Sequence, residues 1–457
     1  MDDLNMRPET TLETDSLEEY RNTEIGHMPK EWQVAELGEV LKLAYRYPTY
    51  YNINYVDTGV PEVRGELLQQ SGDIGSNPSS FRYITEETAK RFPKVRLESG
   101  DLVISVRGTM GKIGIVRSWL TGAVITANLM RLSPNKDHVD PDFLKHLLLS
   151  DLFRERLSRL SPQTTIKTIQ APVLKSIPIP VPPIAEQQAI AAALGTVQKA
   201  IEATEKIIEA TRELKRSLMS HLFTYGPVPV DEADQVPLKE TETGPVPQHW
   251  EAVDSTDCVF FQEGPGIRSY EYSEGGCPII NVRCVRDGYL DLSDARSVSW
   301  DLVEGKWKHF LISEGDILVT TSGTIGRVAR VQKEQLPLLM NTSVVRFRSK
   351  DEDELANGFL RFYLRSKLFF DQLYRQHTGA VIKNVGPSHI RRTKVFFPTL
   401  SEQHRIAAIL AEVDHKVEAE ENRRQTLEVL FKTLLHNLMI GKVRVHDVEL
   451  AEIEEMA

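Results

Sequence analysis

The sequence EQQAIAAAL at residues 186–194 returns as EQHRIAAIL at residues 402–410, shifted by 216 positions. Upstream of it, LESGDLVISVRGTMG (97–111) returns as ISEGDILVTTSGTIG (312–326), shifted by 215 positions. Two separated blocks that recur in one order at nearly the same offset indicate an internal duplication. The repeated unit is far longer than the 20–50 residues that are typical of a solenoid repeat.

A third pair of blocks precedes the other two, with RNTEIGHMPKEW at 21–32 and KETETGPVPQHW at 239–250. The chain is therefore predicted to consist of two similar large halves. Two similar halves present two similar surfaces, which favours a ligand that itself has two parts.

Each Glu-Gln block opens a long helix, and we expect these helices over residues 183–226 and 399–441. Thr399 followed by Glu402 is a capping-box pattern, and a glycine at the end of each range can stop the helix. A helix of about 40 residues is roughly 60 Å long, which exceeds one turn of B-DNA at about 34–36 Å.

Both predicted helices carry a heptad pattern with a polar centre. In the first helix the pattern selects Val197, Ile201, Thr204, Ile208, Thr211, Lys215, Leu218 and Leu222. In the second helix it selects Val413, Val417, Glu420, Arg424, Leu427, Phe431, Leu434 and Leu438. The pattern predicts that the two helices pair inside the chain. Packing of each helix onto its own neighbouring domain is the alternative.

A region of mixed α/β character precedes each helix, at residues 25–182 and 248–398. Short β-branched runs predict strands, and they cover residues 102–106, 113–117, 279–282, 317–321 and 344–347. One helical stretch is expected in each domain, at 143–157 and 359–373. The fold class is thus α+β, with two similar domains separated by two long paired helices. The remaining segments are an N-terminal arm (1–24), a linker (227–247) and an acidic tail (442–457).

The composition excludes several classes of protein. The 457 residues carry a formal net charge of −10, and much of the acidity lies at the two ends. No apolar run approaches the roughly 20 residues that span a bilayer, and the 3 cysteines lack metal-ligand spacing, so we expect a cytoplasmic protein with reduced thiols. No phosphate-binding, zinc-protease, hydrolase or methyltransferase motif is found. Asp142 is expected to cap a helix rather than to serve a nuclease.

Two glycine loops are candidates for contact with DNA. The first offers Arg107, Thr109 and Lys112, and the second offers Thr324 and Arg327. Small loops of this kind allow close approach of the backbone to a phosphate. The alternative is a plain hairpin turn that needs glycine for a positive φ, and the two interpretations are compatible.

Two further groups of polar residues are candidates for DNA contact. Thr165 and Lys167 align with the region of Lys383 in loops ahead of the last predicted strand of each domain. Contact with phosphate or a base edge and simple solvation are equal alternatives for these residues. Arg46, Arg268 and Arg283 lie in early loops that do not match between the halves, and Arg is a residue type that reads base edges. Ordinary divergence of duplicated surfaces explains this mismatch as well.

With these motifs the chain resembles the specificity subunit of Type I restriction–modification systems. The resemblance covers nearly the whole length, and its most specific mark is Pro-x3-Glu-Gln leading twice into a long helix. It implies two target recognition domains, each reading half of an interrupted DNA target, and an antiparallel coiled coil between them. It also implies that the helices dock two modification subunits, with Glu186, Gln187, Glu402, Gln403 and the seam residues in helix pairing or docking.

The resemblance further implies that this chain is not an enzyme by itself. The modification subunits would carry S-adenosylmethionine and methylate adenine, and a restriction subunit would use ATP and Mg²⁺. Two alternatives were weighed. A stand-alone restriction–methylation enzyme would need further domains, for which two halves filling 457 residues leave no space. A coiled-coil scaffold without DNA binding is distinguished by a failure to bind DNA at any salt concentration.

Overall fold

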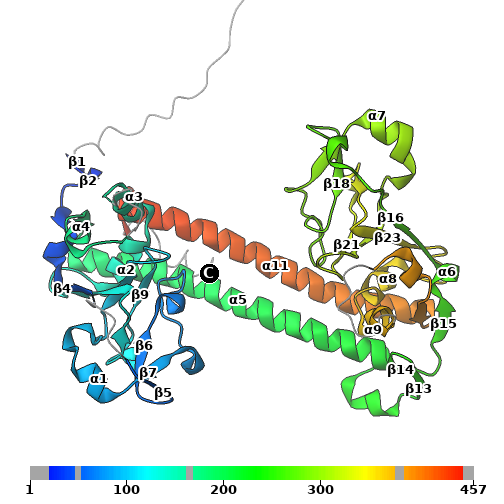
Figure 1. The fold of residues 1–457 in the computed structure, drawn as a ribbon, viewed down its shortest axis with the longest axis horizontal. Coiled ribbons are helices and arrows are strands. Elements are labelled where there is room, and N and C mark those ends of the chain that lie inside the picture. The colour runs from blue at the N-terminus through cyan, green and yellow to red at the C-terminus, as the bar shows by residue number, and fades with distance from the viewer. Residues whose placement is uncertain (1–19, 47–52, 161–167, 376–384, 446–457) are drawn as a thin grey trace, which may run out of the picture. The chain divides into compact units, whose positions relative to one another are not determined.

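The computed structural model describes residues 20–46, 53–160, 168–375 and 385–445. The chain divides into two compact units, the first made of Met1–Glu205 and Asn422–Ala457 and the second of Lys206–Glu421. Each unit contains one α/β domain and the adjoining parts of the two long helices, α5 (Ile184–Tyr225) and α11 (Leu400–Met439) (Figure 1). The two units are described in turn.

The first unit has two four-stranded sheets and two antiparallel strand pairs. The main sheet has the order β4 (Leu41–Arg46), β11 (Leu129–Pro134), β8 (Leu102–Ser105), β9 (Ile113–Ile115). The second sheet has the order β10 (Val124–Ile125), β6 (Val60–Val63), β7 (Arg82–Ile84), β5 (Tyr55–Val56). The pairs are β1 (Tyr20–Thr23) with β2 (Gly26–Pro29), and β3 (Gln33–Glu36) with β12 (Pro178–Val181). Short helices are α1 (Glu86–Lys90), α2 (Pro141–Leu149), α3 (Asp151–Leu160) and α4 (Ala171–Lys175).

The second unit repeats this plan. Its main sheet has the order β16 (Val259–Glu263), β23 (Val344–Ser349), β20 (Ile317–Thr320), β21 (Val328–Arg330). Its second sheet has the order β17 (Tyr272–Ser273), β19 (Arg296–Val298), β18 (Cys277–Ile280), β22 (Leu339–Met340). The pairs are β13 (Leu238–Thr241) with β14 (Gly244–Pro247), and β15 (Glu251–Asp254) with β24 (Lys394–Phe397). Short helices are α6 (Ser255–Cys258), α7 (Trp300–Leu302), α8 (Asn357–Tyr363), α9 (Lys367–Arg375) and α10 (Pro387–Ile390).

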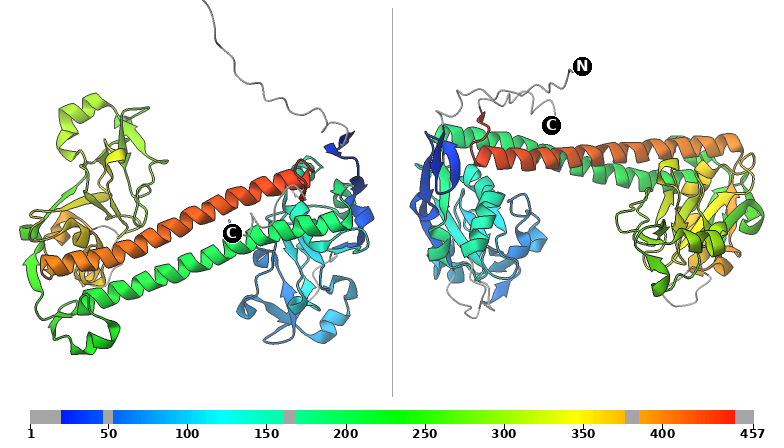
Figure 2. Two further views of the ribbon diagram at one scale, coloured as in Figure 1. Left: turned by 180° about the vertical axis from the view of Figure 1, so that it is seen from behind. Right: turned by 90° about the horizontal axis from the view of Figure 1, so that it is seen from above.

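The long helices pair with each other inside each unit, and they run antiparallel. In the first unit Val197 of α5 and Leu427 of α11 share a buried cluster, and Glu205 lies 3.8 Å from Arg424. In the second unit Leu222 of α5 packs in one core with Ile406 of α11. As the residue number rises along α5, the residue number of its partner on α11 falls. The helices therefore point in opposite directions within each unit (Figure 2). The α+β fold class, with two similar α/β domains and two long helices that run antiparallel within each unit, is confirmed.

The helices also pack onto their own domains, so both packing alternatives are realised together. In the first unit Ile190 and Leu194 of α5 lie in the same core as Phe143 and Leu147 of α2. In the second unit Leu410 of α11 lies in the same core as Phe359 of α8. The apolar stripe of each helix is therefore divided between the partner helix and the adjacent domain.

The prediction of one helical stretch in each domain is wrong, because a serine breaks each stretch into two helices. Ser150 separates α2 from α3 and adopts an extended conformation (φ −67°, ψ 154°). Its hydroxyl accepts a hydrogen bond from Phe153 N at 3.4 Å, in the manner of an N-cap. Ser366 separates α8 from α9 in the same way and accepts a hydrogen bond from Phe369 N at 3.4 Å.

The expected capping by Asp142 is also wrong, because the cap lies two residues earlier. The N-cap of α2 is Asp140, whose carboxylate accepts hydrogen bonds from the backbone N–H groups of Asp142 and Phe143, both at 2.9 Å. Pro141 occupies the first helical position, where its missing N–H costs nothing. Asp142 is thereby free to form an ion pair with Arg117 at 2.9 Å.

Candidate nucleic-acid interface

The glycine loop of the first unit is a hairpin that one hydroxyl closes. Strands β8 and β9 are paired antiparallel, as the hairpin interpretation predicts. The Ser105 hydroxyl donates to Thr109 O at 2.7 Å and accepts from Lys112 N at 2.8 Å. Gly108 and Gly111 have φ of +73° and +79°, a region that only glycine enters readily. The loop is therefore a fixed turn, and Arg107 and Thr109 are exposed on it.

The second unit builds the same turn. Thr320 replaces the serine, and its hydroxyl donates to Thr324 O at 2.5 Å and accepts from Arg327 N at 3.0 Å. Thr324 is exposed, and Arg327 is half-buried with Nη1 3.4 Å from Val285 O. The hydroxyl bonds explain why a serine or threonine precedes each glycine loop, a role that the sequence alone did not reveal.

Arg46 and Arg107 lie at the same edge of the main sheet in the first unit. Arg46 ends β4 opposite Met130 of β11, and Ser105 ends β8 opposite Leu129 of the same strand. Burial, and then the nearby Arg107, lower the pKa of Arg46. This edge thus concentrates positive charge beside the glycine turn, which suits a phosphate backbone.

The corresponding edge of the second unit carries a different charge. Glu263 pairs with Val345 of β23, the place that Arg46 holds opposite Met130. Burial raises the pKa of Glu263 above its ordinary value. The positive residues predicted in this unit lie elsewhere: Arg268 is exposed next to Tyr270, and Arg283 is exposed after β18. The structure therefore does not gather the predicted arginines of the two units into matching positions.

Three predicted contact residues, Thr165, Lys167 and Lys383, lie outside the described part of the chain.

The repeated Gly-Asp motif has a structural role that sequence reasoning missed. Asp101 is buried and accepts hydrogen bonds from Glu98 N and from Arg131 Nε, both at 2.7 Å. Asp316 is buried and accepts from Ser313 N at 2.8 Å, with Arg348 at 2.6 Å. Each aspartate fixes the turn ahead of the glycine hairpin and anchors it to the neighbouring strand. The signal in the sequence was the repetition itself, but the arginine partner lies about 30 residues farther along.

The glutamine of each Glu-Gln block is buried and bonds to backbone groups of its own domain, whereas a part in docking partner subunits stays a prediction. Gln187 is fully buried, accepts from Asp140 N at 2.8 Å, and donates to the carbonyls of His138 and Pro182. Gln403 is also fully buried, and it accepts from Ala356 N and donates to the carbonyls of Glu354 and Pro398. Both side chains therefore make these hydrogen bonds inside their own units.

The glutamate of each block also bonds within its unit. The Glu186 carboxylate accepts from Trp32 Nε1 at 2.9 Å and from Arg444 Nε at 2.6 Å. The Glu402 carboxylate lies 2.8 Å from His249 Nε2. These bonds tie the start of each long helix to the entry segment of its domain.

The predicted seam residues occupy the expected side of each helix. The fully buried members are Val197, Thr204, Ile208, Leu222, Glu420, Leu427 and Leu438. The half-buried members are Ile201, Thr211, Lys215, Leu218, Val413, Val417, Arg424, Phe431 and Leu434. In the second unit Lys215 forms an ion pair with Asp414 across the helix pair, and burial lowers the pKa of Lys215. The polar centre of the seam is thus partly compensated by charge pairing.

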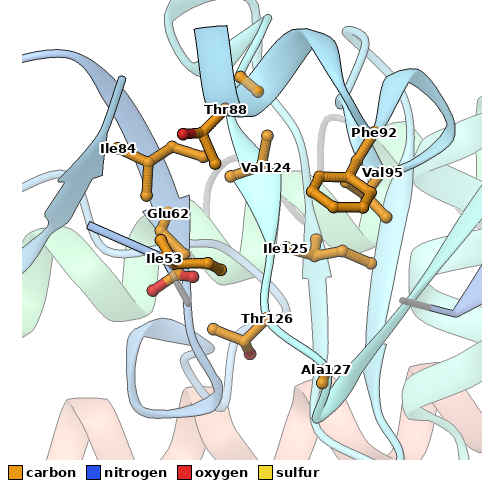
Figure 3. A pocket seen from close by; sticks show the side chains of 11 residues that line it. Ile53, Glu62, Ile84, Thr88, Phe92, Val95, Val124, Ile125, Thr126 and Ala127 are labelled. Atoms are coloured by element: carbon orange, nitrogen blue, oxygen red, sulfur yellow. The ribbon is translucent and has the colours of Figure 1, made fainter. Parts of the chain in front are cut away.

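A small cavity lies beside the second sheet of the first unit (Figure 3). Apolar side chains such as Ile84 and Ile125 line it together with the carboxyl group of Glu62. Burial raises the pKa of Glu62, and Tyr55 Oη donates to its carboxyl at 3.2 Å. The cavity encloses about 20 Å³, which is room for about one water molecule and not for a nucleobase.

Within the described ranges, no group of three or more His, Cys, Asp or Glu side chains is arranged to hold a metal ion. No helix of the described chain is long and apolar enough to cross a membrane.

Comparison with known proteins identifies the class. Residues 29–212 and 247–429 both match the family described as Type I restriction modification DNA specificity domain. Since these two ranges cover most of the chain, the protein belongs to that family, whose function is recognition of a DNA sequence in type I restriction–modification. The resemblance inferred from the repeated blocks is confirmed.

Relatives of similar length support the assignment. The putative type I restriction enzyme MjaX specificity subunit of Methanocaldococcus jannaschii is 26% identical over 440 residues, covering 94% of this chain and 97% of that protein. The EcoKI specificity subunit of Escherichia coli K12 is 23% identical over 406 residues, covering 83% and 82%. The solved Type-I restriction-modification system S subunit from M. genitalium aligns with a TM-score of 0.55 at 17% identity, covering 89% of this chain and 96% of that one. This structural likeness supports the fold.

Proposed function

We propose that this chain reads an interrupted DNA target, with one unit on each half, and directs adenine methylation and restriction by partner subunits. The observation that carries the proposal is the repeated sheet edge with its glycine hairpin. The strand pairing of this edge is the same in both units, but the side chains around it differ, as the half-buried Arg46 and Glu263 illustrate. Similar scaffolds with different exposed side chains suit two half-sites of different sequence.

The partners we propose are two modification subunits and a restriction subunit with translocase activity. S-adenosylmethionine, ATP and Mg²⁺ belong on those subunits, and the target adenine is flipped out of the duplex into a modification subunit. The similarity to a protein that is named a specificity subunit, over 94% of this chain and 97% of that protein, supports this division. The exposed flanks of α5 and α11 are the surfaces proposed for docking, since the seam sides are occupied.

The net charge of −10 is compatible with this function. Arg46 and Arg107 supply local positive charge at the recognition edge of the first unit. Further phosphate contacts are proposed to come from the partner subunits, so that the chain alone binds DNA weakly and in a salt-sensitive manner.

The experiment that tests the proposal is co-expression of this chain with its modification subunit in a host free of adenine methylation. N6-methyladenine is then mapped across the genome at single-base resolution. The expected result is one interrupted motif that is methylated on both strands. The modification subunit expressed alone is the matched control and should give no motif.

A continuous motif, or no motif despite a soluble complex, would contradict the proposal. A complex that fails to bind any DNA between low and physiological salt would favour a coiled-coil scaffold instead.

A further inference from the structure

A groove of about 610 Å³ opens beside the glycine hairpin of the first unit. Four segments line it: the turn that follows Leu68, the hairpin between β8 and β9, the stretch from Leu149 at the end of α2 into α3, and Ile169. The polar side chains on its wall are those of Gln69, Gln70, Lys112 and Arg154, together with the hydroxyl of Ser158. None of these polar residues was singled out by the sequence except Lys112.

The turn that carries the two glutamines is held rigidly. Gly72 N donates to Gln69 O at 3.2 Å, and Gln69 N donates to Asp73 O at 3.0 Å. Gly72 has a φ of +80°, which favours glycine, and a Cβ at this position would lie 2.7 Å from Leu149 Cδ1, so the turn packs closely against α2. Gly72 O also accepts from Ile115 N of β9 at 2.9 Å. A site on such a fixed turn is preorganised for specific contacts.

Gln69 and Gln70 are both exposed on this turn. Neither carboxamide has a hydrogen-bond partner among the described residues. A carboxamide offers a donor and an acceptor side by side, which match the N7 and N6 atoms of adenine in the major groove. Met110, half-buried on the hairpin, adds an apolar surface of the kind that contacts a thymine methyl group.

The charge of the groove favours an anionic ligand. Lys112 and Arg154 line it, and none of its described lining residues is acidic. Within the described ranges neither cation has an ion-pair partner. In a chain of net charge −10, an acid-free groove with two available cations is complementary to a phosphate backbone.

The second unit does not repeat this groove in the corresponding place. Phe370 replaces Arg154, and its ring lies 2.7 Å from the position that a Cβ on Gly326 would occupy. Tyr374 replaces Ser158 and lies next to Phe370 with ring centroids 6.3 Å apart. In the first unit the atom nearest to a Cβ built on Gly111 is Leu157 Cδ2, at 3.9 Å. The groove therefore belongs to the part of the structure that differs between the units.

We propose that this groove is where the first unit reads its half of a double-stranded DNA target. Gln69 and Gln70 contact base edges in the major groove, and Lys112 and Arg154 hold the flanking phosphates. This inference rests on the proposed function and assigns residues to it.

The test uses the full chain in complex with its modification subunit, with Gln69→Ala and Gln70→Ala measured by genome-wide mapping of N6-methyladenine. The expected result is relaxed specificity at one or two base positions of a single half-motif, with discrimination reduced about fivefold to a hundredfold. The other half-motif should be unchanged. Gln33→Ala is the matched control, because Gln33 is an exposed glutamine of the same unit that does not line the groove.

A second variant tests the phosphate contacts. Arg154→Gln should weaken binding to all DNA sequences alike and lower the slope of log affinity against log salt by about 1. Arg159→Gln on the same helix is the control, because Arg159 pairs with Glu155 at 3.5 Å and does not line the groove. Fold integrity is checked for each variant by its thermal unfolding midpoint.

The outcomes separate the two levels of the proposal. If the unmodified complex gives no interrupted motif, the proposed function itself fails. If it gives one, and both glutamine variants keep the same half-motifs with the same discrimination, the groove inference is overturned. A folded glutamine variant that alters both half-motifs equally would overturn it too.

Discussion

The two units share one backbone scaffold but carry different side chains on its surface. Both have the same strand order in the main sheet, a hydroxyl-closed glycine hairpin and a buried aspartate–arginine pair. They differ where side chains reach the surface beside the hairpin, with Arg154 in one unit and Phe370 in the other. The hairpin hydroxyls and the buried aspartates, which agree between the units, bond to backbone groups, whereas the side chain of Arg154 has no hydrogen-bond partner among the described residues.

A second difference lies where each domain meets its long helix. In the first unit Lys145 of α2 bonds Gln198 of α5 at 3.4 Å. In the second unit the equivalent positions are Arg361 and Asp414, which lie 3.5 Å apart as an ion pair. The junction is preserved while its chemistry changes from an amide contact to a charged one. Duplicated domains can therefore exchange one polar junction for another without altering the fold.

The largest expected effect tests the similarity of the two scaffolds. Asp101→Asn removes the buried carboxylate partner of Arg131 and leaves it only the exposed Glu98, and Asp316→Asn removes the buried carboxylate partner of Arg346. Each change should cost about 3–5 kcal/mol of unfolding free energy in its own unit. Pulse proteolysis in urea, with fragments assigned to each unit by mass, measures both. A large loss of unfolding free energy in one unit and none in the other would show that the two aspartate–arginine pairs do not play the same role.

The next effect tests a difference between equivalent tryptophans. Trp32 Nε1 donates to the Glu186 carboxylate, whereas Trp250 Nε1 is buried without a hydrogen-bond partner among the described residues. Trp→Phe removes similar ring volume in both units. Trp32→Phe should therefore cost more than Trp250→Phe by about 1.5–3 kcal/mol, the value of a hydrogen bond to a charged group. The same proteolysis assay reports it, and equal losses would show that the bond contributes nothing.

The smallest effect is a pH dependence confined to the first unit. His146 is buried in α2, and burial lowers its pKa well below the ordinary 6.5; Phe362 takes its place in the second unit. Since the unfolded chain binds the proton near pH 6.5 and the folded unit does not, stability is full above that pH. Below pH 6.5 the free energy of unfolding decreases by at most about 1.4 kcal/mol per pH unit.

His146→Phe copies the second unit and should remove this slope between pH 7.0 and 5.5. Urea midpoints of the first unit at the two pH values measure it. A slope that survives in the variant would assign the acid sensitivity to other groups.

Much of the architecture was predictable because it depends on local sequence patterns, such as the spacing of apolar residues and the positions of glycine. Heptad spacing identified the seam from Val197 to Leu222, since periodicity reports which side of a helix is buried. The glycine hairpins were predictable because a positive φ requires glycine. The helix breaks at Ser150 and Ser366 were not predicted, because an apolar stretch gives no sign that a serine hydroxyl will cap a new helix within it.

The candidate site was predictable only in part. The role of Gln187 depends on the carbonyls of His138 and Pro182 that it meets after folding, so its repetition alone did not reveal that it is buried. The groove joins Gln70, Lys112 and Arg154 from three distant segments. No local pattern connects such segments, so a sequence met alone cannot place these side chains together.

The central claim is that one scaffold, used twice, reads two independent half-sites. The measurement that tests it most directly replaces residues 248–398 with the corresponding domain of another family member and maps N6-methyladenine in complex with the same modification subunit. The account predicts that one half-motif changes while the other half-motif is retained. A change in both half-motifs, or in neither, would contradict it.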